Sequence, residues 1–253
     1  MPLSTGDAVL LATAGFGAGA VNAVAGGGSL ISFPALLAAG YPSVTANVTN
    51  AVALVPGYLG GTLGYRPELK GQRSRAVALG AGAGLGAAAG AAVLLVTSAQ
   101  VFASLVPFLV LGACALLAVE PLLRRHLPPP DPDRPAEHRV RLHLATFAAG
   151  FYGGYFGGGL GILLLAILGL ALRDGLQRLN ALKGLLALVV GVVSAAAFAA
   201  FGPVAWGAAG IMVVASLAGG NLGVRLARRL SPAVLRTAIV IYGVGVGIAL
   251  LVT

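Results

Sequence analysis

Two glycine triplets interrupt long apolar stretches of this chain: Gly26-Gly27-Gly28 in residues 7–39 and Gly157-Gly158-Gly159 in residues 142–172. A helix that begins after such a break offers free N–H groups and a partial positive charge, which together attract anions. Glycine also lets a ligand approach the backbone closely. We therefore predict an anion site formed by backbone amides near Gly27, Gly28, Ser29, Gly158, Gly159 and Leu160.

Four polar side chains in or beside apolar stretches are candidates for the same site. Lys183 is the only Lys or Arg well inside a predicted span, roughly 10 Å along the helix from Leu176. Buried ionisable groups in membranes are functional candidates, but a lysine can also reach the headgroups along its own stem. Asn22, Thr49 and Asn180 either line the site or form hydrogen bonds between helices.

Composition restricts the class of protein. The chain has 253 residues, of which 58% are hydrophobic and 9% charged. A soluble domain has about 25% charged residues, so a soluble enzyme and a disordered protein are both excluded. The single cysteine, Cys114, excludes a disulfide framework and a cysteine-based metal site. The net charge of +9 comes from short loops, which indicates membrane topology rather than nucleic-acid binding.

The sequence predicts an all-α polytopic membrane protein. Residues 7–39 and 142–172 would each measure about 45–50 Å as one straight helix, well beyond a ~30 Å hydrocarbon core, so each divides into two arms at its triplet. A hydrophilic, proline-containing linker is expected at 122–141. Six stretches have the roughly 20 residues that a spanning helix needs: 44–64, 76–99, 101–119, 176–201, 204–224 and 233–252.

The two halves of the chain, 1–121 and 142–253, repeat the same order of elements. When the first triplet is aligned with the second, Gly19 falls on Gly150 and Thr49 falls on Asn180. The alignment shifts slightly near the end of each half, where Ser98 matches Ser231. Each half contains one interrupted hairpin followed by three spans. Internal repeats of this kind are common in secondary transporters.

The position of the 16 Lys and Arg residues distinguishes two topologies. If both interrupted stretches cross the membrane, the basic clusters are divided between its two faces. If both are re-entrant hairpins, all 16 lie on one face, which the positive-inside tendency places in the cytoplasm. The second arrangement predicts inverted repeats, with basic loops in the cytoplasm and both termini outside.

Several segments resemble the TauE/SafE sulfite exporter family. They are Gly15 to Gly19, Gly26 to Ser29 with Pro34, Asn180-Ala181-Leu182-Lys183, and Gly219 to Leu230. The resemblance covers nearly the whole chain except the linker. It implies a bacterial-type plasma-membrane permease for sulfite, thiosulfate, sulfoacetate or other sulfonates. Leu165 stands where a match to Pro34 would lie, so the two hairpins need not contribute equally.

These features lead to the hypothesis of a secondary transporter that holds a small sulfur-containing anion at the midplane, between the two hairpin tips. Lys183 would neutralise charge, Asn22, Thr49 and Asn180 would donate hydrogen bonds, and one half would move against the other. The expected partners are the anion and the lipid bilayer, without nucleic acid, metal, cofactor or catalytic residue; a homo-oligomer is left open. The alternative is a transporter or channel for another small solute, and an intramembrane enzyme or a structural subunit are further interpretations.

Overall fold

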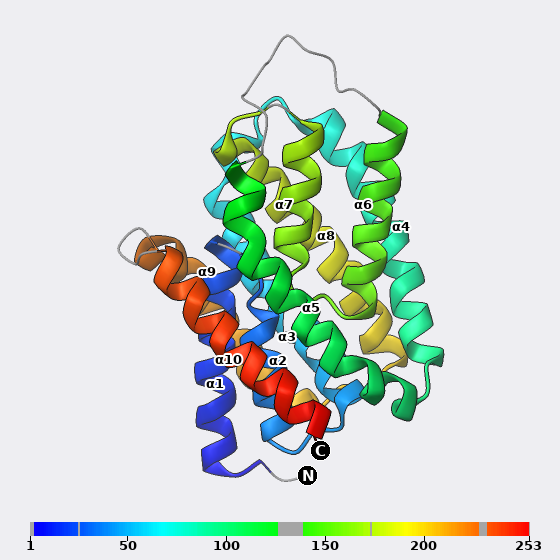
Figure 1. The fold of residues 1–253 in the computed structure, drawn as a ribbon, viewed down its shortest axis with the longest axis vertical. Coiled ribbons are helices and arrows are strands. Elements are labelled where there is room, and N and C mark those ends of the chain that lie inside the picture. Colours follow the sequence, from blue (N-terminus) through cyan, green and yellow to red (C-terminus); the bar gives the residue numbers. More distant parts are fainter. Residues whose placement is uncertain (1–2, 25, 126–138, 173, 228–231, 253) are drawn as a thin grey trace.

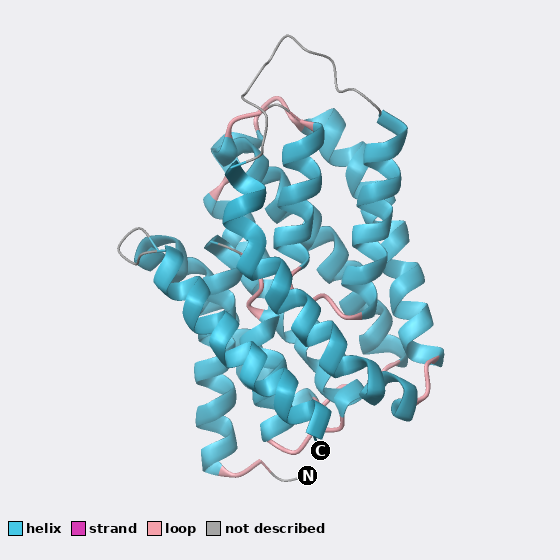
Figure 2. Ribbon diagram, in the orientation of Figure 1, coloured by secondary structure: helices cyan, strands magenta, loops and turns pink. Residues whose placement is uncertain are grey.

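Helices are the only regular secondary structure in the part of the chain that the computed structural model describes, which confirms the expected all-α class (Figures 1 and 2). The described residues are 3–24, 26–125, 139–172, 174–227 and 232–252. Within these ranges the helices are α1 (Thr5–Val24), α2 (Ser29–Ala38), α3 (Ser43–Gly64), η1 (Arg66–Leu69), α4 (Arg73–Val96), α5 (Ala99–Arg125), α6 (Arg139–Tyr155), α7 (Leu160–Ala171), α8 (Leu176–Phe201), α9 (Trp206–Ala227) and α10 (Pro232–Val252).

Both interrupted stretches form helical hairpins that turn at their glycine triplets. Gly26, Gly27, Gly157 and Gly159 have φ angles of 75°, 112°, 80° and 74°, a region that residues with a Cβ atom rarely adopt. The chain therefore reverses direction at each break. Figure 1 shows α2 returning toward the end of the molecule where α1 begins, and α7 returning toward the beginning of α6.

The long helices include three, among the described residues, whose length and composition suffice to cross a membrane: Arg73–Val96, Ala99–Leu122 and Leu176–Phe201. Helical residues occupy both ends of the range 122–141, where a linker is expected. Helix α5 continues past Pro121 to Arg125, and α6 already begins at Arg139. A proline within a membrane helix is tolerated where neighbouring groups satisfy the freed carbonyl, so α5 can continue through Pro121. Residues 126–138 lie outside the described part of the chain.

The helices pack in pairs that join the two halves of the chain. Helix α1 packs on α9 and α4 on α6, while α3 contacts α8 and α5 contacts α10. In Figure 1 α5 runs away from the end where both termini lie, and α10 runs toward it. The two halves of the chain therefore do not form separate units, because these helix pairs each join one half to the other.

Two matching pairs of glycines allow the closest of these contacts. A Cβ atom on Gly19 of α1 would overlap the carbonyl oxygen of Ser216 on α9. A Cβ atom on Gly150 of α6 would likewise overlap the carbonyl oxygen of Ala83 on α4. In the alignment of the two halves Gly150 matches Gly19, and Ser216 matches Ala83 in the slightly shifted later part. Residues that the sequence alignment matches therefore take part in corresponding helix contacts.

At the same two helix pairs, glycines on α4 and α9 lie against carbonyl oxygens of α6 and α1. A Cβ atom on Gly86 would overlap the carbonyl oxygen of Phe147, and one on Gly219 would overlap that of Phe16. The same alignment matches Gly219 with Gly86 and Phe147 with Phe16. Small residues that let backbones approach closely are typical of helix packing in membranes.

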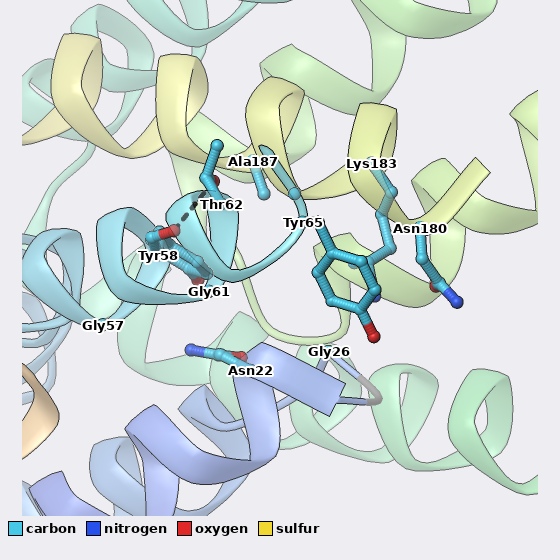
Figure 3. A pocket seen from close by; sticks show the side chains of 12 residues that line it. Asn22, Gly26, Gly57, Tyr58, Gly61, Thr62, Tyr65, Asn180, Lys183 and Ala187 are labelled. Carbon is cyan, nitrogen blue, oxygen red and sulfur yellow. Dashed lines mark hydrogen bonds between the residues drawn. The ribbon is translucent and has the colours of Figure 1, made fainter. Parts of the chain in front are cut away.

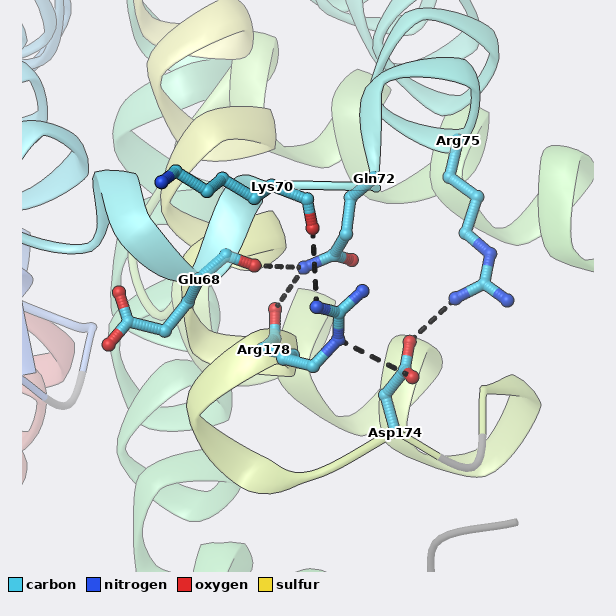
Figure 4. Close-up of polar contacts among 6 residues, drawn as sticks. All are labelled: Glu68, Lys70, Gln72, Arg75, Asp174 and Arg178. Carbon is cyan, nitrogen blue, oxygen red and sulfur yellow. Dashed lines mark hydrogen bonds and ion pairs between the residues drawn. The ribbon is translucent and has the colours of Figure 1, made fainter. Parts of the chain in front are cut away.

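A polar cluster ties the α3–α4 connection to the α7–α8 connection (Figure 4). Asp174 lies 2.6 Å from Nη1 of Arg75 and 3.7 Å from Nε of Arg178. The buried Gln72 donates through Nε2 to the carbonyl oxygen of Arg178 at 3.2 Å. Both arginines are more than 40% exposed, so each ion pair contributes at most about 1 kcal/mol.

Candidate functional site

The two helix breaks touch each other near the centre of the fold. A Cβ atom placed on Gly26 would lie 2.8 Å from Cα of Gly161, and one placed on Gly161 would lie 2.9 Å from Cα of Gly26. Gly26 opens the first triplet, and Gly161 is the second residue of α7. Glycine is required on both sides of this contact, because no side chain fits between the two backbones.

Asn22 holds the first break in shape. Its Oδ1 accepts hydrogen bonds from the backbone N–H groups of Gly27 at 3.1 Å and Gly28 at 2.7 Å. Because an N–H group can only donate, these two bonds fix which end of the amide faces the backbone. The amide nitrogen Nδ2 therefore points the other way, where it is buried without a hydrogen-bond partner.

Different residues hold the second break. The hydroxyl group of Tyr152 donates to the carbonyl oxygen of Gly158, so the end of α6 is tied across the triplet. Asn47 of α3 donates through Nδ2 to the carbonyl oxygen of Tyr155 at 2.9 Å, which satisfies one of the free carbonyls at the end of α6. The second break therefore keeps its shape through a tyrosine of its own hairpin and an asparagine of the other half.

A small cavity lies beside the contact between the breaks (Figure 3). Its volume is about 20 Å³, which is enough for one water-sized group. The end of α1, the second half of α3, the start of α7 and the first half of α8 enclose it. The lining residues are Asn22, Gly26, Gly57, Tyr58, Gly61, Thr62, Tyr65, Gly161, Asn180, Lys183, Gly184 and Ala187.

Three predicted site residues meet at this cavity: Asn22, Asn180 and Lys183. They are 8%, 7% and 4% exposed, so Lys183 does not extend freely to solvent. Asn180 and Lys183 lie three residues apart on one face of α8, and Figure 3 shows both projecting beside Tyr65. Oδ1 of Asn180 is buried without a hydrogen-bond partner. None of the described residues that line the cavity carries a carboxylate, so the site combines a cation with amide groups.

The sulfite exporter TauE/SafE family model matches residues 11–250 of the chain, which include both breaks and every residue of the cavity. The chain belongs to the TauE/SafE family. Two relatives have similar length. A probable membrane transporter protein of Haemophilus influenzae is 29% identical over 244 residues, covering 92% of this chain and 89% of the relative. A probable membrane transporter protein, ORF9, of a Sinorhizobium species is 29% identical over 244 residues, covering 95% and 91%. No solved structure matches the chain.

The cavity of this TauE/SafE member also contains two tyrosines and a threonine that sequence reasoning missed. Tyr58 packs its ring against α8, where a Cβ atom on Gly191 would lie 3.2 Å from the ring. Its hydroxyl group lies near the side chains of Asn22 and Ser29. Thr62 donates to the carbonyl oxygen of Tyr58 at 2.8 Å, and Tyr65 follows at the end of α3. One signal was present in the sequence: Gly57 and Gly60 lie at helical spacing on either side of Tyr58, and both face backbone atoms of α9.

Thr49 and the second triplet lie elsewhere. Thr49 is fully buried and accepts a hydrogen bond from the backbone N–H of Ala205 at 2.9 Å, just before α9 begins. Gly158 is enclosed by the Phe156 ring, and Gly159 faces Ala113 of α5. None of these three residues lines the cavity. Their positions indicate roles in shaping the helix ends around it.

Three of the predicted backbone donors already have acceptors within the protein. The amides of Gly27 and Gly28 donate to Asn22, and the amide of Leu160 donates to the carbonyl oxygen of Gly157 at 3.3 Å. Ser29 lies beside Tyr58 rather than on the cavity wall. In this conformation the side chains of Asn22, Asn180 and Lys183, more than the amides of the triplets, face the cavity.

Asn22 allows its structural role to be separated from its role toward a ligand. Asn22→Ala leaves two backbone N–H groups without an acceptor, so we expect a loss of about 1–3 kcal/mol in unfolding free energy. Asn22→Asp keeps the acceptor for Gly27 and Gly28 but turns a second oxygen toward the cavity in place of Nδ2. We expect the aspartate variant to stay folded and to lose anion binding, as measured by thermal unfolding with and without sulfite. Anion binding equal to that of the wild type in Asn22→Asp would contradict a ligand-facing Nδ2.

Proposed function

We propose that this TauE/SafE member is a secondary membrane transporter for small sulfur-containing anions, such as sulfite, thiosulfate, sulfoacetate or other sulfonates. One observation carries the proposal: the cavity at the contact of the two breaks contains a buried lysine and amide groups, with no carboxylate among its described lining residues. The family assignment and the membrane-transporter names of both relatives agree with it.

Electrostatics favour an anion over the alternative of another small solute. A buried ammonium group in a membrane protein is costly and is retained where it has a functional partner. The positive charge of Lys183 would repel a cation from this cavity and would add little to the binding energy of a neutral solute. Two acidic residues of the described part of the chain pair with arginines away from the cavity: Asp174 with Arg75, and Glu120 with Arg236 at 3.1 Å.

The size of the cavity bears on the mechanism. A volume of about 20 Å³ is too small for an anion with three or more oxygens, so the surrounding helices have to separate before it enters. The cavity extends from the breaks toward Tyr65 at the end of α3. Beyond Tyr65 the chain leads to the polar cluster at the start of α4, whose exposed Arg75–Asp174 ion pair would close this side and is weak enough to open readily.

Aromatic rings pack together around the second break, where they would form the other seal of a transport cycle. Phe33 of α2 and Phe156 at the second break pack edge to face with ring centroids 5.4 Å apart. Phe102 of α5 and Tyr155 of α6 pack similarly at 5.7 Å. Such pairs contribute about 0.5–1.5 kcal/mol beyond their buried area, so this side forms the tighter seal. An alternating-access cycle would open the two sides in turn.

The proposed cycle uses two inverted repeats. The equivalent glycine contacts of α1 with α9 and of α6 with α4 support this relation, as do the opposite directions of α5 and α10 (Figure 1). Two hairpins that turn back at touching breaks support a re-entrant arrangement, with the Arg66–Arg75 loop in the cytoplasm and both termini outside.

The two ends of α4 provide a test of this topology. Ser74 and Gln100 are exposed near opposite ends of α4, and Cys114 is buried. In a Cys114→Ala background, Gln100→Cys should react with a membrane-impermeant maleimide on intact cells, whereas Ser74→Cys should react only after permeabilisation. Labelling of Ser74→Cys on intact cells would show that this end of α4 lies outside the cell and would contradict the proposed orientation.

The function is tested with purified protein in liposomes. Labelled sulfite, sulfoacetate and an inorganic cation are offered separately, and empty liposomes provide the background rate. We expect the sulfur anions to equilibrate faster than the background and the cation not to. Sulfite and sulfoacetate fluxes no higher than in empty liposomes would refute the proposed substrates, and cation flux alone would support the alternative.

A further inference from the structure

A long apolar groove runs along the outer surface between α4 and α8, away from the central cavity. Its volume is about 980 Å³. Figure 1 places α4 at the edge of the molecule. The groove is lined by Leu69, Arg73, Ala76, Val77, Gly80, Ala81, Gly84, Leu85, Ala88, Leu185, Val189 and Val193. The proposed transport function uses none of these residues.

Small residues on one face of α4 make the hollow. Ala76, Gly80, Gly84 and Ala88 follow one another at intervals of four residues, which is one helical face. A Cβ atom placed on Gly84 would lie 3.4 Å from the side chain of Val189, so α4 and α8 approach each other closely along the floor of the groove. Val77 and Leu85, which are 66% and 68% exposed, form an apolar rim along the same helix.

The length of the groove corresponds to one leaflet of a bilayer. From Arg73 to Ala88 the helix rises about 22 Å. Half of a hydrocarbon core measures about 15 Å, and the rest extends into the headgroup region. An acyl chain that enters from the Arg73 end therefore has an apolar channel along its whole leaflet.

The polar end of the groove carries a single cation without a partner. Arg73 is exposed and makes no ion pair or side-chain hydrogen bond with any residue that the structure describes. The neighbouring Arg75 and Arg178 are different, because both already contact Asp174 (Figure 4). The guanidinium of Arg73 is thus available to a phosphate at the level of the headgroups.

We infer that the groove binds an anionic phospholipid, with an acyl chain along α4 and the headgroup phosphate on Arg73. Basic sites between membrane helices bind anionic headgroups, and the excess of basic residues at this end draws such lipids to it. A second copy of the chain fits less well. In a two-fold contact the same patch meets itself, so docking groove on groove would bring two uncompensated Arg73 side chains together.

The inference is tested on the full-length protein in detergent with two lipids that carry the same acyl chains, phosphatidylglycerol and phosphatidylcholine. Binding is counted by native mass spectrometry, and the oligomeric state is read from the same spectra. Arg73→Gln removes the headgroup contact, while Ala81→Trp fills the groove at an exposed position. Arg125→Gln is the matched control, because it removes an exposed arginine outside the groove.

The wild type and Arg125→Gln should prefer phosphatidylglycerol by about fivefold, as expected from one basic contact near the headgroups. Arg73→Gln should lose that preference and still bind both lipids, whereas Ala81→Trp should bind less of either. Equal binding of the two lipids by the wild type, or an unchanged preference in Arg73→Gln, would overturn the inference. A dimer that Ala81→Trp dissociates would instead assign the groove to a second copy. Sulfite flux is measured separately, so its absence would affect the proposed function and not this site.

Discussion

Replacing Lys183 with methionine should weaken sulfite binding by about 30-fold or more. Removing one partner of a buried charge pair costs at least about 2 kcal/mol, because the other charge is left uncompensated. Lys183 is 4% exposed and is the one charged group among the described residues of the cavity wall. Methionine keeps most of the side-chain length, so the packing of α8 against α3 should change little.

The matched control is Arg125→Met, which removes an exposed arginine at the end of α5. Its sulfite affinity should change less than twofold, because exposed charges contribute little and are screened by salt. Affinity is measured by isothermal titration calorimetry and rate by uptake into liposomes. Thermal unfolding of Lys183→Met without sulfite shows whether the variant is folded. Equal losses of affinity in the two variants would exclude Lys183 from the site.

Local chemistry made much of the architecture predictable. The triplets at Gly26 and Gly157 lie in stretches too long for one span, so the two breaks followed from length and from the freedom of glycine. Helix α8 begins at Leu176 and ends at Phe201, the limits of its apolar stretch. The alignment of the two halves recurs as contacts because a repeated sequence places the same small residues at the same helix crossings.

The partners of the polar groups were not predictable in the same way. Thr49 aligns with Asn180, but Thr49 receives the amide of Ala205, which is far away in sequence, and only Asn180 reaches the cavity. The amides of Gly27 and Gly28 were expected to be free, and Asn22 satisfies both. Such choices depend on which side chain the tertiary fold brings within about 3 Å, and no spacing in the sequence encodes that.

The residues that line the cavity differ between the two aligned halves of the chain. Asn22 aligns with Gly153 in the second half, so only the first hairpin presents an amide side chain at this point. Lys183 aligns with Val52, so only the second half supplies a cation. The side chains that line the cavity therefore stand at positions where the aligned halves carry different residues.

Substituting Gly161 with alanine should disturb both stability and transport, because of the contact between the breaks. Gly161 lies in the first turn of α7, where alanine would normally stabilise a helix by up to about 1 kcal/mol. Here the new Cβ atom would lie 2.9 Å from Cα of Gly26, which is backbone and cannot rotate away. We expect the free energy of unfolding to fall by about 1–3 kcal/mol, as for overpacked cores, and sulfite uptake to fall at least tenfold.

Gly112→Ala is the matched control for this substitution. Gly112 is a helical glycine of α5 with open space around its Cβ position, so alanine should leave uptake unchanged and raise stability slightly. Chemical denaturation and liposome uptake of both variants distinguish a general effect of adding a methyl group from an effect at the contact. If Gly161→Ala transports sulfite as well as Gly112→Ala does, then transport does not require the two breaks to touch. The substrate would in that case have to bind away from the place where the hairpins meet.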